Sequence, residues 1–251
     1  MSGWDDPATA RFYEEFDRRH DRYRRANEEL VREAALEPGQ RVLDVGAGLG
    51  GTARAAVAAC SGLDILCFEP AAAMRERGRE LVPYARWTGT PPDERFDRVL
   101  CGASIWLLGP PDEAIQRLAR LVAPGGSLAF ALPALYLGEP DEPGGGADPL
   151  LLELPARLAD GRVPDAPAGE LIPDPEQLLR DAGLEPRAWS FEVRLKQAAL
   201  RDWLKIPPLT AALLGELDPD ERAAVVDSAY ASVDPKSWRR ERWRGWTATR
   251  R

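Results

Sequence analysis

Residues 42–50 read Val-Leu-Asp-Val-Gly-Ala-Gly-Leu-Gly, and this stretch decides the fold. A short run of β-branched and leucine residues enters a loop rich in glycine, and the alanine-rich residues 52–59 continue as a helix. Glycines at such a junction leave bare backbone beside a helix N-terminus, where a ligand can approach closely. The stretch therefore predicts a strand, a ligand-binding loop and a helix.

The same alternation continues on the C-terminal side of the loop. Short apolar runs predict strands and amphipathic runs predict helices, with turn residues between them. Alternating strands and helices favour a doubly wound α/β protein, in which a parallel sheet carries helices on both faces. The predicted strands lie at 65–68, 85–88, 98–101 and 127–132, and the predicted helices at 71–81 and 112–121.

The segments on either side of this core have a different composition. Aromatic and aliphatic residues recur at helical spacing near the N-terminus, which predicts one or two amphipathic helices over 8–36. Proline and glycine crowd residues 138–175, which favours an irregular insertion. Further along we expect a helix at 176–181, a strand at 188–195, helices over 198–231 broken at Pro207-Pro208 and Asp218-Pro219, and a strand at 244–248.

A chain of 251 residues with 44% apolar residues is expected to fold as a single domain over 1–251. We divide it into a helical lid (1–37), a cofactor-binding core (38–136), an insertion or cap (137–182) and C-terminal strands with cap helices (183–251).

Charge and cysteine content limit the partners. A net charge of −8 argues against nucleic acid, and the arginine-rich stretches 18–25 and 239–244 are interpreted as solvated surface. Apolar stretches such as 128–137 are too short to span a membrane, and the charged N-terminus is unlike a signal peptide, so we expect a cytoplasmic protein. Cys60, Cys67 and Cys101 lack metal-ligand spacing, so we expect buried reduced thiols and no metal.

The glycine loop alone fits two classes of cofactor. Gly46, Gly48 and Gly51 also satisfy the spacing of a dinucleotide-binding loop, and Glu69 ends the second predicted strand, where an acid holds ribose hydroxyls in either class. Asp44 separates the two, because its carboxylate would repel a pyrophosphate and attract a cationic sulfonium and ammonium. A structural role for Asp44, binding amides of the loop, is the alternative.

Four motifs in order resemble those of class I S-adenosylmethionine-dependent methyltransferases of the small-molecule type, and the resemblance covers most of the chain. The glycine loop resembles the first motif, and Phe-Glu-Pro at 68–70 with Met74 resembles the second-strand acid and the adenine-packing residue. Residues 96–107 resemble the fourth strand and its following loop, and 121–126 resemble the turn into the fifth strand.

This resemblance implies a Rossmann-like seven-stranded sheet with the last strand antiparallel, a helical N-terminal lid and an α-helical cap. It also implies S-adenosyl-L-methionine as cofactor, bound by Asp44, Gly46, Ala47, Gly48, Gly50, Glu69, Pro70, Met74, Gly102, Ala103 and Ser104. One departure stands out, since family members often carry Gly-Asp after the third strand and this chain has Gly89-Thr90. The Thr90 hydroxyl can still accept a hydrogen bond from adenine.

Methyl transfer depends chiefly on positioning and exclusion of water, and a base is required only for some acceptors. The resemblance places the N-terminal helix over the cofactor, which makes Tyr13, His20 and Tyr23 candidate catalytic residues, with surface roles as the alternative. Trp203, Ile206 and Pro207-Pro208 are candidates to line an apolar pocket, with core packing equally open. Trp106 could likewise line the pocket or pack in the core.

The sequence therefore predicts methyl transfer to O, N or C of a small, apolar or aromatic molecule. Base-methylating enzymes resemble one another in an Asn/Asp-Pro-Pro-aromatic motif after the fourth strand or in a Pro-Cys nucleophile, and this chain has Cys-Gly-Ala-Ser at 101–104. A nicotinamide-dependent oxidoreductase and a non-catalytic binding or scaffold protein of the same fold are the alternatives. The acceptor and the oligomeric state are not readable from the sequence.

Overall fold

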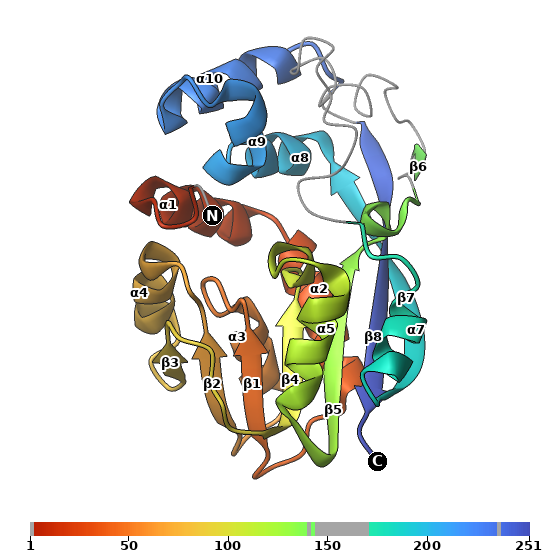
Figure 1. The fold of residues 1–251 in the computed structure, drawn as a ribbon. Helices are drawn as coiled ribbons and strands as arrows, with labels where there is room; N and C mark the ends of the chain where they lie inside the picture. The colour runs from red at the N-terminus through yellow and green to blue at the C-terminus, as the bar shows by residue number, and fades with distance from the viewer. Residues whose placement is uncertain (1–2, 140–141, 144–170, 235–236) are drawn as a thin grey trace.

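The computed structural model describes residues 3–139, 142–143, 171–234 and 237–251. Strands β3, β2, β1, β4, β5, β8 and β7 lie side by side in this order in one sheet, shown in Figure 1. The last strand, β8, is antiparallel to both of its neighbours, so the predicted arrangement is confirmed. The strands are β1 (Arg41–Val45), β2 (Asp64–Phe68), β3 (Arg86–Thr88), β4 (Phe96–Gly102), β5 (Val122–Pro133), β7 (Glu185–Lys196) and β8 (Trp238–Thr249).

The alternation of side chains along β1 explains why both faces of the sheet are covered. Leu43 packs into a cluster with Val99 and Phe130 on one face, and Val42 packs with Ile65 in a second cluster. Residues two apart in a strand point to the same face, so a continuous apolar run fills two cores at once. Helices α2 (Arg22–Ala34) and α3 (Gly51–Ala59) supply the second cluster, and α5 (Pro111–Arg120) and α7 (Pro175–Asp181) supply the first.

The cap helices begin where the sequence predicts breaks. Proline fits the first position of a helix because its missing N–H has no partner there in any case. Pro207 opens α9 (Pro207–Leu214) and Pro219 opens α10 (Pro219–Tyr230), where Asp218 forms a capping box with Glu221. Helix α8 (Gln197–Leu204) precedes them.

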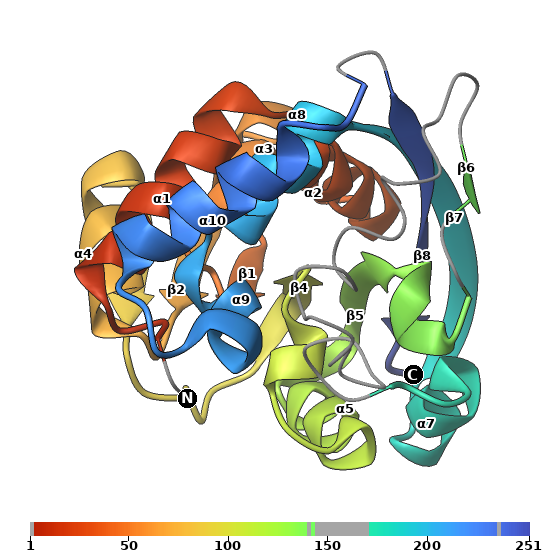
Figure 2. The ribbon, with the colours of Figure 1, turned by 90° about the horizontal axis from the view of Figure 1, so that it is seen from above.

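The N-terminal helix α1 (Pro7–Arg19) separates the cap from the core. In Figures 1 and 2 it lies between α4 (Ala72–Leu81) on the sheet side and α8 to α10 on the other. Arg77 of α4 binds Glu14 through two hydrogen bonds of 2.7 and 2.6 Å, and Arg11 binds Asp220 of α10. The lid is thus held by ion pairs on both sides.

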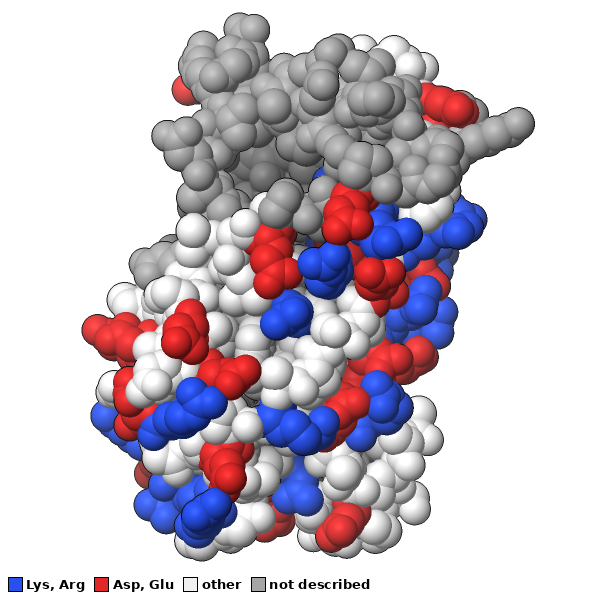
Figure 3. Space-filling view, turned by 90° about the vertical axis from the view of Figure 1, so that its right-hand side faces the viewer, with Lys and Arg blue, Asp and Glu red and all other residues white. Residues whose placement is uncertain are grey.

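The far edge of the sheet carries charges of both signs. Figure 3 shows blue and red side chains interspersed on the side where α7, β6 and β7 lie in Figure 1. Arg242 is 2.9 Å from Glu142 and Arg240 is 3.5 Å from Glu192, so part of the C-terminal arginine-rich stretch is paired with acids. The two-residue strand β6 (Glu142–Pro143) pairs with β8 and adds to the predicted sheet.

The predicted insertion is only partly visible. Residues 137–139, 142–143 and 171–182 are described, and the remainder of 137–182 lies outside the described residues. Within the described ranges no helix combines the length and apolar character that a membrane span requires.

Candidate functional site

The glycine loop leaves β1 at the carboxyl edge of the sheet. The N–H groups of Gly46 and Ala47 donate to the carbonyl oxygen of Phe68 at 2.9 and 3.1 Å, which ties the loop to the end of β2. Gly46 and Gly48 have φ angles of 64° and 54°, a backbone conformation that favours glycine. A Cβ on Gly48 would meet only the Met74 methyl, at 3.6 Å, so this part of the loop faces open space.

A cavity of about 490 Å³ lies against this loop. We call the part formed by the ends of β1 and β2 the loop half, lined by Gly46, Ala47, Gly48, Leu49, Gly51, Thr52, Glu69, Pro70, Ala71 and Met74. Gly102, Ala103 and Ser104 at the end of β4 form its boundary with the aromatic half. We call the rest of the lining the aromatic half: Trp4, Tyr13, Asp17, Tyr23, Asn27, Trp106, Leu107, Leu108, Gly109, Tyr136, Trp203, Pro208 and Leu209. At its border with the loop half, Trp4 and Tyr13 pack against Leu49 and Met74, and Asn27 accepts a hydrogen bond from the Thr52 hydroxyl.

Glu69 supplies the one charged group of the loop half. Its Oε2 accepts from the N–H of Gly48 at 2.8 Å, and its Oε1 accepts from the N–H of Ala71 at 2.9 Å. Burial raises the pKa of Glu69, while these two hydrogen bonds act in the opposite direction. The carboxylate is therefore fixed at the end of β2, facing the cavity beside the glycine loop.

Asp44 lies beneath the loop and does not line the cavity. Its side chain is buried, and Oδ2 accepts from the N–H of Ala53 at 3.2 Å, which is an amide of helix α3 and not of the loop. Oδ1 is buried without a hydrogen-bond partner among the described residues. Burial, together with the nearby Glu69 charge, raises the pKa of Asp44 to about 7. A cationic ligand in the loop half would relieve this unfavourable charge.

The end of β4 forms the boundary between the two halves of the cavity. Ala103 has a φ of 53°, unusual for a residue with a side chain, and Ser104 donates to the carbonyl oxygen of Val45 at 3.0 Å. A Cβ on Gly102 would come within 2.5 Å of the Thr52 hydroxyl and 2.7 Å of the Asn27 carbonyl oxygen. Glycine at position 102 therefore lets β4 lie close to helices α2 and α3.

Aromatic side chains from four separate segments form the walls of the aromatic half. The rings of Trp106 and Tyr136 stack with centroids 4.2 Å apart, and those of Tyr13 and Tyr23 stack at 5.6 Å. The indole N–H of Trp203 donates to the Tyr23 hydroxyl at 2.8 Å, which joins the cap to the N-terminal helices. These contacts fix the rings before any ligand enters.

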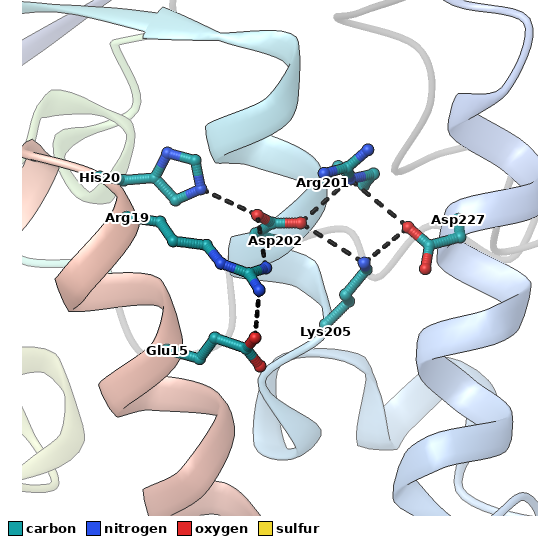
Figure 4. A network of polar contacts seen from close by, with 7 residues as sticks. All are labelled: Glu15, Arg19, His20, Arg201, Asp202, Lys205 and Asp227. Atoms are coloured by element: carbon teal, nitrogen blue, oxygen red, sulfur yellow. Dashed lines mark hydrogen bonds and ion pairs between the residues drawn. The ribbon is translucent and has the colours of Figure 1, made fainter.

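The three candidate catalytic residues do not lie together. Tyr13 and Tyr23 line the cavity, and burial raises the pKa of both phenols, so they stay protonated at neutral pH. His20 does not line it, and its Nε2 lies 2.9 Å from Asp202 in the polar network of Figure 4. The expectation that His20 faces the site is therefore not met, because the chain turns at residue 20 between α1 and α2.

Asp202 is the centre of that network. Burial raises the pKa of this carboxyl, but hydrogen bonds from His20 and Arg201 together with the Lys205 charge outweigh it, and the pKa falls well below its usual range. The network joins the end of α1 to α8 and, through Asp227, to α10. Its contacts are those of a support between lid and cap.

Five other expected residues lie outside the cavity lining, among them Pro207, the first residue of α9. Gly50 is the N-cap of α3, and a Cβ there would come within 2.6 Å of Val82, so its glycine serves packing. Thr90 is exposed and its hydroxyl pairs with Thr88 Oγ1, while Gly89 is covered by the Arg75 guanidinium. Ile206 is fully buried in the core. The expected adenine contact at Gly89-Thr90 is therefore absent from the described lining.

The polar lining residues Asp17, Asn27 and Thr52 were missed from the sequence. Asp17 follows Tyr13 by four residues and Asn27 follows Tyr23 by four, so each pair shares a helix face. That spacing was the available signal. The candidate lining residues Trp106, Trp203 and Pro208 do line the cavity.

The cysteines and acids offer no cluster of ligands for a metal ion among the described residues. Cys67 and Cys101 are buried, as expected, whereas Cys60 at the end of α3 is partly exposed.

Comparison with known proteins identifies related chains. A family model described as "Methyltransferase domain" matches residues 18–187. The trans-aconitate 2-methyltransferase of Delftia acidovorans is 30% identical over 113 residues, 42% of each chain, and that of Azoarcus sp. is 27% identical over 256 residues, covering 94% of this chain and 93% of the relative.

A solved structure shares the fold across most of the chain. The YcgJ protein from Bacillus subtilis superposes with a TM-score of 0.55 at 14% identity, over 90% of this chain and 98% of that one. Several of the matches to curated relatives are shorter, and there the chain spans about half the length of the relative or less.

Proposed function

Since the chain belongs to the family of class I S-adenosylmethionine-dependent methyltransferases, we propose that it transfers a methyl group from this cofactor to a small apolar or aromatic molecule. The observation that carries the proposal is the shape of the cavity. Bare glycine backbone and an anchored acid form one half, and fixed aromatic rings form the other.

The residues of the loop half fit S-adenosylmethionine. Glu69 would bind the ribose hydroxyls, Met74 would pack on adenine, and the open face of Gly48 would receive the ligand. The buried carboxylate of Asp44, with one oxygen unpaired, would favour the positively charged methionine end. When bound, the cofactor supplies an electrophilic methyl group on a sulfonium.

The chain's own residues would orient the acceptor and exclude water from the reaction. The Trp106–Tyr136 stack and the Tyr23–Trp203 hydrogen bond hold the walls of the aromatic half in place. Fixed walls orient an acceptor and exclude water, which are the main requirements of methyl transfer. Tyr13 and Tyr23, with their raised pKa values, would act as hydrogen-bond donors to the acceptor.

The name of the curated relatives makes trans-aconitate, a tricarboxylate, an acceptor to consider. Among the described residues, the charged side chains that line the cavity are Asp17 and Glu69, and neither Lys, Arg nor His lines it. Like charges repel strongly in a partly buried cavity. We therefore propose an acceptor without several carboxylates.

A thermal-shift titration separates the proposal from its alternatives. S-adenosylhomocysteine should raise the melting temperature, and NAD should leave it unchanged, because binding to the folded state alone stabilises it. Stabilisation by NAD alone would support a nicotinamide-dependent oxidoreductase. Lack of binding by both in a well-folded sample would support a non-catalytic scaffold.

A further inference from the structure

We propose that the methyl acceptor is a small benzyl-type amine, protonated at neutral pH, and that the aromatic half selects amines over carboxylates and alcohols. This inference rests on the proposed function and concerns the same cavity. It starts from charge. The described lining of the aromatic half contains one ionisable acid, Asp17, and neither Lys, Arg nor His.

Two cations close to these walls, Arg22 and Arg54, are already paired with acids. Arg22 lies over the Trp203 ring, 4.6 Å from its centroid, and binds both oxygens of Glu241 at 2.9 and 2.5 Å. Arg54 donates to Asp17 at 2.6 Å. Neither lines the cavity, so a carboxylate acceptor would lose its hydration and meet no compensating side-chain charge among the described residues.

An ammonium group meets the opposite conditions. The faces of aromatic rings carry negative potential and attract cations, most strongly where water is excluded. The aromatic half offers six such side chains, of which Tyr23 and Trp203 already have the Arg22 guanidinium over one face. Asp17, bound by Arg54 of α3, adds an acid. A benzyl-type body would pack between the rings while its ammonium lies against them.

The lack of an unengaged base among the described lining residues of the aromatic half favours amines over alcohols. Burial keeps Tyr13 and Tyr23 protonated, and Asp17 is engaged by Arg54. An alcohol needs a base to become a nucleophile, whereas an amine needs only to release the ammonium proton to water. The nitrogen lone pair then forms the nitrogen–carbon bond while the carbon–sulfur bond breaks and its electron pair remains on sulfur. The positive charge passes from sulfur to the methylated nitrogen.

Three probes of similar shape test the charge preference directly. We would titrate benzylamine, benzyl alcohol and benzoate into the protein saturated with S-adenosylhomocysteine, using calorimetry. We expect benzylamine to bind at least about tenfold more tightly than benzoate, with benzyl alcohol between them. Equal affinities, a preference for benzoate or binding of none of the three would overturn the inference. Failure of S-adenosylhomocysteine to bind in the first step would instead overturn the proposed function.

A variant of one wall tests whether the rings carry the preference. Trp203→Leu keeps an apolar side chain but removes the ring face, so benzylamine affinity should fall by about fivefold or more while benzyl alcohol changes by less than about twofold. Trp203→Phe should restore most of the preference. Trp238→Leu is the matched control, because Trp238 stacks on Arg194 away from the cavity lining. Equal losses for both probes in Trp203→Leu would show that the ring acts only by packing.

Discussion

The two halves of the cavity are built in different ways. The loop half is mostly backbone and comes from two short runs of sequence, 46–52 and 69–74, at the ends of adjacent parallel strands. The aromatic half is mostly side chain and comes from segments as far apart as Trp4 and Leu209. A site made of local backbone can be found by a motif, whereas a site made by distant helices depends on how they pack.

Their electrostatics differ as well. The loop half has a buried acid beneath it and an anchored acid beside it, Asp44 and Glu69, whose pKa values are both raised by burial. The aromatic half carries one acid that is already paired with Arg54. The first half is therefore suited to a cationic cofactor, and the second to an uncharged or cationic acceptor.

Blocking the loop half should have the largest effect. In Gly48→Val a branched side chain enters the cavity, so we expect affinity for S-adenosylhomocysteine to fall by at least about 100-fold. Gly39→Val is the control, because Gly39 also has a positive φ, of 85°, but lies in an exposed turn with open space around it. Calorimetry on both variants measures the difference. Equal affinities would show that Gly48 does not face the ligand.

Removing the charge of Glu69 should have a smaller effect on the same half. Glu69→Gln keeps the shape but loses a charged acceptor for the Gly48 amide and the ribose hydroxyls, so affinity should fall by about tenfold. Glu76→Gln on the exposed face of α4 should leave affinity unchanged. A Glu69→Gln variant that binds like the wild type would remove this residue from the site.

The buried charge of Asp44 should appear as a pH dependence of stability. Its pKa rises from 3.8 to about 7 on folding, so between these values the folded chain holds a proton that the unfolded chain has released. Stability contributed by this group therefore falls as pH rises through that window and is constant above it. Relative to Asp44→Asn, the cofactor-free wild type should lose at least about 1 kcal/mol, roughly 3 °C in Tm, from pH 5 to pH 8. Parallel melting curves for both proteins would contradict the raised pKa.

Changes to the lid–cap support should affect the reaction least. His20→Gln removes the contact with Asp202 but alters no lining residue, so we expect methyl transfer within about twofold of wild type and a slightly lower Tm. Steady-state rates measured with an amine that is turned over provide the test. A loss of about 100-fold or more would return His20 to the catalytic residues.

The sequence predicted the sheet and the loop half because their signals are local. Strand periodicity, the glycine loop and the prolines at 207 and 219 each act on neighbouring residues, and the structure places the elements accordingly. The prediction failed where facing direction mattered. Glycine spacing did not reveal that Gly50 packs close to Val82 outside the cavity lining, and the motif order did not reveal that Arg75 covers Gly89.

The aromatic half was predicted only in part, for a related reason. The candidates Trp106 and Trp203 do line the cavity. Ile206, three residues after Trp203, does not, because it is the N-cap of α9 and its side chain is buried in the core. Asp17 and Asn27 became visible only once α1 and α2 were placed over the loop. Spacing along a helix could place Asp17 and Asn27 on the same faces as Tyr13 and Tyr23, but which way those faces turn depends on long-range packing.

A crystal structure with S-adenosylhomocysteine bound tests the central claim, the division of the cavity into two halves, most directly. The ribose hydroxyls should contact Glu69 in the loop half, and the sulfur should face the aromatic half across residues 102–104. Density for the adenosine in the aromatic half, or a sulfur that faces away from Tyr23 and Trp203, would contradict this division.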